Sequence, residues 1–325
     1  MNVRRLSMLS CAAAAALACA LPFGAQAQGW PTKPIRLVVP FSAGGANDLM
    51  ARAAAEGASK QLGQPVVIDN KPGAGAILGA DVVAKSAPDG YTFLVSAAGV
   101  VSNSMIKKNM PYKDEALVPV AMIGLAPSVV VVPADAPYKD LKEFVAASKK
   151  SGNGFHWATA GTGSTPHFVE GILQTKYGGK LDVVPYKSGS ESITAVLGSQ
   201  VEATSEASIV VLPYVKSGKL KALAGTWTQR ISAYPELPTA AEEGFPEIRI
   251  AHWAGVHAPR GTPDAIMDKM AAAVDAAMKS PEIAKRLKDM GIEPVGGTRA
   301  SFAKFVDEER ARLGSVVKAT GMKED

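Results

Sequence analysis

Cysteine is almost absent from this chain of 325 residues, which contains only Cys11 and Cys19. Both lie within residues 1–27, where the sequence has the features of an export signal. Once that segment is removed, the remaining chain can form no disulfide, bind no metal through a thiolate and use no cysteine nucleophile. Thiol chemistry is therefore excluded as the basis of the mature protein's function.

Basic clusters and long hydrophobic runs are also missing. The formal net charge is +5, and loss of Arg4 and Arg5 with the signal would lower it by two, to +3. No dense Lys/Arg stripe with interleaved aromatic residues occurs, so we expect no nucleic-acid partner. No later run is long enough to span a membrane, which takes about 20 apolar residues. These absences favour a soluble protein, and the mild positive charge is compatible with an anionic ligand.

Common catalytic motifs are absent, because the sequence has no GxSxG elbow, no phosphate-binding P-loop and no HExxH. His252 and His257 are five residues apart on a predicted strand, so they should face opposite sides and share no metal ion. Ser164 and His167 are close together but lack an evident orienting carboxylate. We therefore predict a protein that is not an enzyme and needs no cofactor or metal. A periplasmic hydrolase that uses Ser164 and His167 is one alternative.

The N-terminus has the three parts of a secretory signal. These are positive charges at Arg4 and Arg5, an alanine-rich run over residues 10–23, and small residues at Ala25 and Ala27. We predict a signal peptide over residues 1–27, cleavage after Ala27 and a periplasmic location. Lipid attachment at Cys19 is an alternative, although the preceding Ala16-Leu17-Ala18 has alanine where a lipobox usually has leucine.

Strand-like and helical patterns alternate along the mature chain. Residues 35–40, 66–69 and 91–96 read as short strands, with helical patterns at 48–62 and 76–86 between them. This βαβαβ order predicts a parallel sheet with helices on both faces. The alternation restarts after residue 120, with expected strands within 120–132, 155–160, 183–186, 201–205, 220–226 and 248–258, and expected helices at 141–149, 166–177, 190–197, 212–217, 263–279 and 299–320.

Two half-sheets of this kind predict an α/β protein with two doubly wound lobes around a central cleft. The mature length, 298 of the 325 residues, suits two lobes or one large domain. Clefts between lobes and the carboxyl ends of parallel strands are favoured ligand sites.

Glycine-containing loops join several predicted strands to the helices that follow. The first is residues 41–48 (FSAGGAND), and residues 161–167 (GTGSTPH) repeat the design. Glycines before a helix N-terminus expose backbone N–H groups to an anion, so both loops predict carboxylate binding; ordinary tight turns are the alternative. Residues 71–79 have the spacing GxGxxxG, which favours a tight turn with close helix packing over a dinucleotide site. Glu206, at a predicted strand end, faces either a ligand or solvent.

Six segments carry a specific pattern when they are taken in order. They are residues 30–52 (WPTKPIRLVVPFSAGGANDLMAR), 66–96 (VVIDNKPGAGAILGADVVAKSAPDGYTFLVS), 158–168 (ATAGTGSTPHF), 183–189 (VVPYKSG), 234–246 (YPELPTAAEEGFP) and 293–297 (EPVGG). Together they resemble the tripartite tricarboxylate transporter substrate-binding proteins, also called Bug receptors, over essentially the whole mature chain. The resemblance implies a type II periplasmic binding protein fold, with lobe 1 formed by residues 28–129 plus 251–325 and lobe 2 by residues 130–250.

The resemblance also implies where the ligand is held. One ligand carboxylate is gripped by the first glycine loop and neighbouring strand ends, and the second lobe contributes the opposite wall. Two segments depart from the family pattern, since Pro-Gly-Gly reads Ala43-Gly44-Gly45 and a frequent Asp-Asn pair reads Glu206-Ala207. The implied ligand-binding residues are Ser42, Gly44, Gly45, Asn47, Asp48, Ser96, Ala97, Thr162, Ser164, His167, Glu206 and Ser208.

The function implied is capture of a small organic carboxylate, namely a di- or tricarboxylate, an aromatic acid or an amino acid. Hinge closure would trap the ligand, because only the closed form contacts it from both lobes. The expected partners are membrane transporter subunits, and the expected form is a monomer. The lack of an evident pocket arginine indicates neutral donors for the carboxylate. A sensory adaptor that presents its closed form to a receptor kinase is the other alternative.

Overall fold

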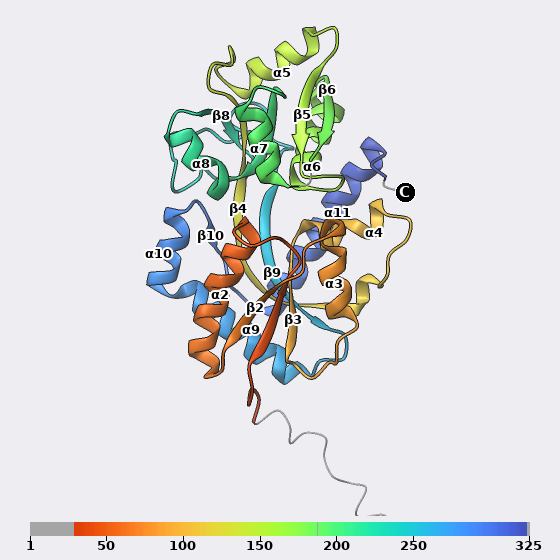
Figure 1. The fold of residues 1–325 in the computed structure, drawn as a ribbon, viewed down its shortest axis with the longest axis vertical. Helices are drawn as coiled ribbons and strands as arrows, with labels where there is room; N and C mark the ends of the chain where they lie inside the picture. The colour runs from red at the N-terminus through yellow and green to blue at the C-terminus, as the bar shows by residue number, and fades with distance from the viewer. Residues whose placement is uncertain (1–28, 187, 324–325) are drawn as a thin grey trace, which may run out of the picture.

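The computed structural model describes residues 29–186 and 188–323, so the predicted signal peptide and its cleavage site lie outside the described residues. The described chain forms two lobes joined by the long strands β4 (Leu117–Pro133) and β9 (Ala251–Pro259) (Figure 1). This arrangement confirms the predicted α/β architecture with two lobes. Within these residues, no helix combines the length and the hydrophobicity that crossing a bilayer requires.

The sheet of the first lobe has the strand order β2-β1-β3-β9-β4, and the short strand β10 also pairs with β4. The first three strands are parallel, as predicted, whereas β9 runs antiparallel to both of its neighbours. The other elements are β1 (Ile35–Val39), α2 (Ala46–Leu62), β2 (Val66–Asn70), η2 (Ala74–Ala76), α3 (Ile77–Ala84), β3 (Thr92–Ser96), α4 (Ala98–Ile106), η3 (Asp114–Ala116), α9 (Asp264–Lys279), α10 (Pro281–Asp289) and β10 (Glu293–Pro294).

The sheet of the second lobe has the order β6-β5-β7-β4, with β8 on the other edge of β4. Strand β5 is parallel to both β6 and β7, and β4 is antiparallel to β7 and β8. The elements are α5 (Leu141–Lys150), β5 (Phe155–Thr159), α6 (Thr165–Tyr177), β6 (Leu181–Pro185), α7 (Gly189–Leu197), β7 (Ala203–Ala207), α8 (Ser208–Lys216) and β8 (Leu220–Gly225).

Strand β4 belongs to both sheets. Its residues 117–127 pair with β9, and its residues 128–133 pair with β7 and β8. The change of partner falls beside the predicted lobe boundary at Val129, although the exact division of the chain into lobes stays a prediction. Because β4 continues through the junction without a loop, any movement of one lobe against the other must bend this strand.

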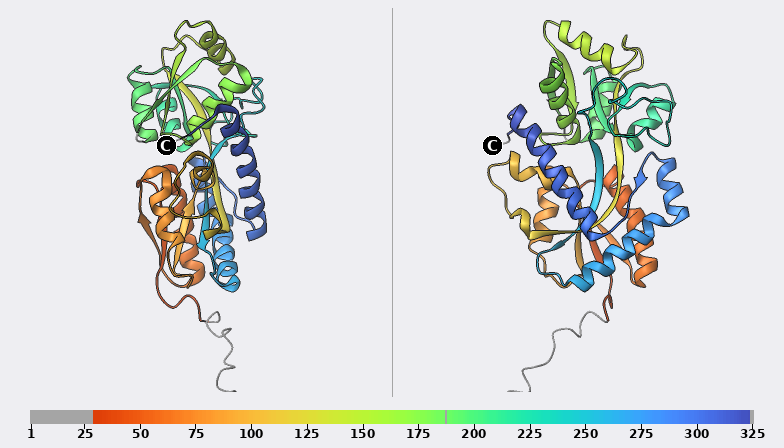
Figure 2. Two further views of the ribbon diagram at one scale, coloured as in Figure 1. Left: turned by 90° about the vertical axis from the view of Figure 1, so that its right-hand side faces the viewer. Right: turned by 180° about the vertical axis from the view of Figure 1, so that it is seen from behind.

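Helix α11 (Arg299–Thr320) forms a second connection between the lobes. It begins at a capping box formed by Thr298 and Ser301 and ends at Gly321, where φ is +69°. It contacts α4 and β4 of the first lobe and α6 of the second. Figure 2 shows it running alongside the strands from one lobe toward the other, in front of them in the right-hand view.

The core explains why β1 reads as a continuous apolar run. Ile35, Leu37 and Val39 belong to a cluster that includes residues of α2 and α9, whereas Val38 belongs to a cluster with α3. Successive residues of a strand point to opposite faces, so β1 is buried on both sides. This confirms the prediction made from its sequence.

Several elements differ from the sequence prediction. Helices α4 and α10 were not expected, and α8 begins at Ser208 rather than Leu212 despite the proline inside it. Strand β7 covers residues 203–207 rather than 201–205, because Glu206 and Ala207 pair with β4. Glu206 therefore lies within a strand and not beyond its end.

Candidate functional site

A cavity of about 520 Å³, here called the cleft, lies between the two lobes. In the first lobe it is lined by the segments that follow β1, β2 and β3, and in the second lobe by those that follow β5, β6 and β7. It therefore occupies the carboxyl ends of the parallel strands of both sheets, the position predicted for a ligand site. Eight of the twelve predicted site residues line it: Ser42, Gly44, Gly45, Asn47, Ala97, Thr162, Ser164 and Glu206.

Five helices begin at the cleft without a side-chain cap. The residues that precede them are Gly45 for α2, Ala76 for α3, Ala97 for α4, Ser164 for α6 and Ala207 for α8, and no side chain of these residues accepts a hydrogen bond from its helix. A sixth helix at the cleft, α7, is capped by the Ser188 side chain, and side chains also cap α5 and α11. The first N–H groups of a helix have no partner within it, and the helix dipole adds partial positive charge there. The cleft therefore concentrates backbone donors suited to a carboxylate.

Asp48 stabilises the first glycine loop by accepting a hydrogen bond from its backbone. Gly44 has a φ of +83°, and its N–H donates to Asp48 Oδ2 over 2.9 Å. The carboxylate, 1% exposed, also accepts from Arg52 Nε at 2.8 Å and from Asn70 Nδ2 at 2.9 Å. Burial alone would raise the pKa of Asp48, but the hydrogen bonds from Arg52, Gly44 and Asn70 outweigh it and lower the pKa. Asp48 does not line the cleft, so we assign it a positioning role in place of the expected ligand contact.

The second glycine loop repeats this design with a histidine. The Gly163 N–H donates to His167 Nδ1 over 3.2 Å, across the same four-residue spacing as Gly44 and Asp48. Burial lowers the pKa of His167, which favours the neutral ring that can accept this bond. The His167 side chain is thus engaged by the loop, and His167 is not among the residues that line the cleft.

The hydrolase alternative loses its geometric support here. The Ser164 hydroxyl donates to the Gly161 carbonyl oxygen over 2.6 Å, and His167 Nδ1 is occupied by the Gly163 N–H. A nucleophilic serine needs a base within hydrogen-bond reach. Ser164 instead stabilises the loop that lines the cleft before α6.

Three further predicted residues bind backbone carbonyl groups. Asn47 Nδ2 donates to the Trp253 oxygen over 2.8 Å, and Ser96 Oγ donates to the Gly255 oxygen over 3.1 Å, so both are tied to β9. Ser208 Oγ donates to the Gly291 oxygen over 2.6 Å, which joins α8 of the second lobe to the end of α10. Asn47 lines the cleft, whereas Ser96 and Ser208 lie beside it, fully buried.

Sequence reasoning missed three parts of the wall. Residues 72–76 after β2, residues 188–190 at the start of α7, and His252 with Trp253 on β9 all line the cleft. The loop after β2 was read as a tight turn with close helix packing, and a Cβ on Gly79 would indeed lie 2.7 Å from the Pro40 Cβ. The signal that could have indicated a ligand site here is the run of small residues directly after a strand.

Glu206 and His252 form one wall of the cleft. Glu206 is 3% exposed, so the solvated-loop alternative for it is wrong. Its Oε2 lies 3.8 Å from His252 Nε2, and neither Glu206 Oε1 nor His252 Nε2 has a hydrogen-bond partner. Burial raises the pKa of Glu206 to about 8 and lowers the pKa of His252 to about 4. Both side chains are therefore mainly neutral at pH 7.

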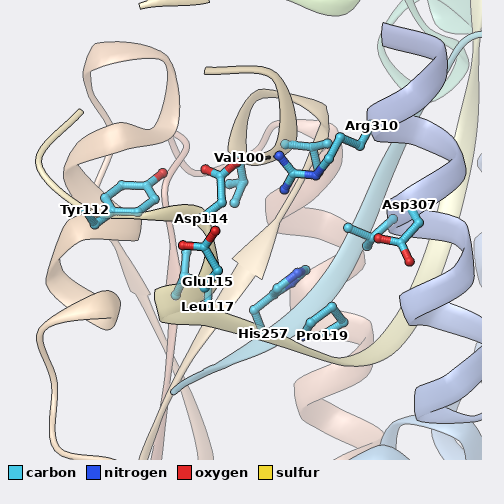
Figure 3. Close-up of a pocket in the computed structure, with 11 residues that line it drawn as sticks. Val100, Tyr112, Asp114, Glu115, Leu117, Pro119, His257, Asp307 and Arg310 are labelled. Atoms are coloured by element: carbon cyan, nitrogen blue, oxygen red, sulfur yellow. Dashed lines mark hydrogen bonds and ion pairs between the residues drawn. The ribbon is translucent and has the colours of Figure 1, made fainter. Parts of the chain in front are cut away.

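A second cavity, of about 320 Å³, lies between α4, the start of β4, the end of β9 and α11. We call it the α11 pocket. Figure 3 shows Arg310 reaching toward Asp114, with which it forms an ion pair, while Glu115 and Asp307 add two more carboxylates. This excess of negative charge makes the pocket unfavourable for an anionic ligand.

The α11 pocket also contains His257. Burial, and to a smaller extent the nearby Arg310, lower the pKa of His257 to about 3. His252 and His257 thus line different cavities, in agreement with the predicted opposite orientations. In the part of the chain that the structure describes, no group of His, Cys, Asp and Glu side chains is arranged to hold a metal ion.

Comparison with known proteins identifies relatives over most of the chain. Residues 50–322 match the family model described as the tripartite tricarboxylate transporter family receptor. The structure of the periplasmic binding protein BugD is 30% identical, with a TM-score of 0.82 and coverage of 91% of this chain and 100% of that chain.

Two further solved structures were determined with ligands. A Rhodopseudomonas palustris protein with adipate is 31% identical, with a TM-score of 0.84 and coverage of 90% of this chain and 98% of that chain. MatC from Rhodopseudomonas palustris with bound malate is 32% identical, with a TM-score of 0.79 and coverage of 89% and 100%. Both ligands are small carboxylates.

Proposed function

The chain belongs to the tripartite tricarboxylate transporter receptor family, and from that premise we propose that it captures a small organic carboxylate in its cleft and delivers it to the membrane subunits of such a transporter. Its relatives are binding receptors and not enzymes. The observation that carries the proposal is the convergence of the uncapped N-termini of α2, α4 and α6 on one cavity.

The donors suit an anion that arrives without a metal or a paired cation. Backbone N–H groups at a helix start are fixed in place by the fold, so they need little reorganisation when the ligand binds. Asp48 and His167 hold the two glycine loops in the conformation that exposes these groups. Adipate and malate in two relatives support a ligand with at least one carboxylate.

Closure of the lobes would complete the site. The first glycine loop and the segment after β2 belong to one lobe, and the loop before α6 and Glu206 belong to the other. A ligand that contacts both sides selects the closed form. The movement would bend β4 and β9 where they pass between the sheets.

A charge placed at the cleft tests this proposal. Ala43 is exposed and lines the cleft, so a larger side chain there should leave folding intact. Ala43→Glu should weaken carboxylate binding by roughly tenfold or more, whereas the isosteric Ala43→Gln controls for size. Added salt should reduce the difference in carboxylate affinity between the two variants, because it screens the introduced charge.

Isothermal titration with adipate, malate and related acids measures the affinities directly. A thermal-shift panel gives an independent reading, because a ligand at 100 times its dissociation constant adds about 2.7 kcal/mol to the free energy of unfolding. If no organic acid raises the melting temperature, or if the glutamate and glutamine variants bind equally well, the carboxylate proposal fails.

Export is the remaining part of the proposal. We expect the mature protein to be a periplasmic monomer that begins at Gln28. Intact mass of the protein purified from the periplasmic fraction checks the cleavage site, and a diacylglycerol-modified Cys19 would contradict it. Sedimentation equilibrium checks the monomer.

A further inference from the structure

The wall formed by Glu206 and His252 is chemically unlike the rest of the cleft. Glu206 Oε1 and His252 Nε2 are buried polar atoms without a hydrogen-bond partner, in residues that line the cavity. A Cβ on Gly189 would lie 2.6 Å from Glu206 Oε2, so the carboxyl group packs directly on the first turn of α7. Buried polar groups are nearly always paired in native proteins, which indicates that this wall is built to receive a partner.

No other ionisable side chain among the described residues lines the cleft. On β4, the residues paired with Glu206 and Ala207 are Val129 and Ser128, and neither carries a charge. The acidic residue in the first turn of α7 is Glu191, which is exposed. Helix α6, which also packs on β7, carries His167 and Glu170, but neither lines the cleft, and His252 is the one titratable partner of Glu206 among the described residues.

This wall disfavours a second ligand carboxylate. Two carboxyl groups in contact inside a low-dielectric site cannot both be ionised without strong repulsion, so a second ligand carboxylate can bind here only while Glu206 keeps its proton. An ammonium group fits better, since it has three N–H donors and no acceptor. Both oxygens of an ionised Glu206, and Nε2 of a neutral His252 whose proton is on Nδ1, are acceptors suited to such a group.

We propose that the cleft selects zwitterionic ligands, with a carboxylate at the N-termini of α2, α4 and α6 and an ammonium group between Glu206 and His252. This inference rests on the proposed capture of a carboxylate and narrows its ligand class. On binding, the Glu206 carboxyl group gives its proton to solvent and becomes the counterion of the ammonium group, which keeps its own protons.

The proton balance provides a direct readout. Since burial holds Glu206 mainly in its protonated form at pH 7, an ω-amino acid should release about one proton per molecule bound. Its affinity should rise with pH from 6 to 8, because the proton that must leave becomes easier to remove. A dicarboxylate should release none.

Isothermal titration of the purified protein in two buffers of different ionisation enthalpy tests the proposal. The probes are matched pairs of one chain length each: 3-aminopropanoate with malonate, 4-aminobutanoate with succinate, 5-aminopentanoate with glutarate, and 6-aminohexanoate with adipate. At the preferred length, the amino acid should bind at least roughly tenfold more tightly than its dicarboxylate partner, with proton release.

Two variants locate the effect. Glu206→Gln keeps the shape of the side chain but removes its ionisation, so it should abolish proton release and the preference for the amino acid. Glu170 is a matched control, because it is another buried glutamate, 4% exposed, that does not line the cleft. Glu170→Gln should leave both the preference and the proton release unchanged.

The outcomes separate the two proposals. If dicarboxylates bind more tightly than their amino partners, or if Glu206→Gln leaves the preference intact, the zwitterion inference is overturned while carboxylate capture stands. If neither series binds, and the wider panel of organic acids also fails, carboxylate capture itself is wrong.

Discussion

The cleft and the α11 pocket each contain a histidine from the same strand, yet the two cavities differ in almost every other respect. His252 and His257 are both held neutral by burial. Around His252 the wall is built from glycine loops, helix starts and one buried glutamate. Around His257 it is built from an ion pair, two exposed carboxylates and apolar side chains.

The difference shows that a buried histidine does not by itself mark a ligand site. The cleft offers backbone N–H groups at helix starts as donors, whereas the one cationic side chain in the lining of the α11 pocket, Arg310, is already paired with Asp114. A functional site is thus distinguished here by available backbone donors and not by the number of ionisable residues. Substitutions in the two cavities should therefore have different consequences.

The largest expected effect comes from Gly255, which lies on β9 between the two histidines. A Cβ at this position would be 2.1 Å from Phe302 Cζ of α11. Gly255→Ala should therefore lower the free energy of unfolding by about 3 kcal/mol or more, measured by urea denaturation. Gly44→Ala in the cleft loop is the comparison, because its Cβ meets nothing within 4 Å and only the φ of +83° is unfavourable. Gly44→Ala should lower the free energy of unfolding by about 1–2 kcal/mol. Equal losses in the two variants would contradict the expectation that the contact with Phe302 dominates.

Substitutions in the two cavities should also have different effects on stability at alkaline pH. The pKa of Glu206 is raised from 4.5 to about 8, so the unfolded state loses its proton first and stability falls as pH rises between these values. Glu206→Gln lacks this loss, and at pH 9 it should be more stable than the parent protein by on the order of 3 kcal/mol, with little gain at pH 4.

Asp114→Asn is the control in the α11 pocket. The Asp114 carboxylate accepts hydrogen bonds from Arg310 and from Ser104 Oγ, the latter over 2.7 Å. The substitution replaces this carboxylate by a weaker acceptor. This variant should lose stability at neutral and alkaline pH instead of gaining it. Thermal melts across the pH series measure both variants, and a gain for Asp114→Asn at pH 9 would count against the distinction.

Two arginine-paired carboxylates should also respond unequally to removal. Asp48, 1% exposed, supports the cleft loop through three donors, whereas Asp114 is 19% exposed in its ion pair with Arg310. Asp48→Ala should cost about 2 kcal/mol of stability, and Asp114→Ala about 0.5–1 kcal/mol. Since hydrogen bonds lower the pKa of Asp48 below 3.8, its contribution is present above pH 3.8 and is lost as the pH falls through its folded value.

The smallest effect concerns binding and not folding. His252→Leu should weaken binding of the preferred ω-amino acid by roughly tenfold, because it removes an acceptor for the ligand's ammonium group from the cleft wall. His257→Leu changes the equivalent group in the α11 pocket and should leave the affinity within about twofold. Isothermal titration at pH 7 measures both, and a similar loss in both variants would show that the pocket is coupled to the cleft.

The position of the site could be predicted from the sequence more reliably than the roles of its residues. Both glycine loops lie where their strand–loop–helix patterns placed them, since such patterns depend on neighbouring residues alone. The roles of Asp48 and His167 could not be predicted from neighbouring residues in this way. A side chain in the first turn of a helix can face the ligand or accept from its own loop, and only the folded loop shows the second arrangement.

The wall around Glu206 depended on contacts far apart in the sequence. Pairing with β4 extends β7 through Glu206, and β9 brings His252 to within 3.8 Å of it. Nothing near Glu206 in the sequence indicates either neighbour. The segment after β2 was likewise read as a simple turn, because its neighbours in the cleft come from other loops.

The sequence by itself determined the α/β class, the alternation of strands and helices, the glycine loops that present backbone donors and the family to which the chain belongs. These follow from local composition and from motifs read in order. Only the tertiary structure decided which polar side chains reach the cleft and which brace it, and which of them lose their charge. Burial and long-range pairing fix those properties, because the electrostatic cost of a charge depends on everything that surrounds it in space.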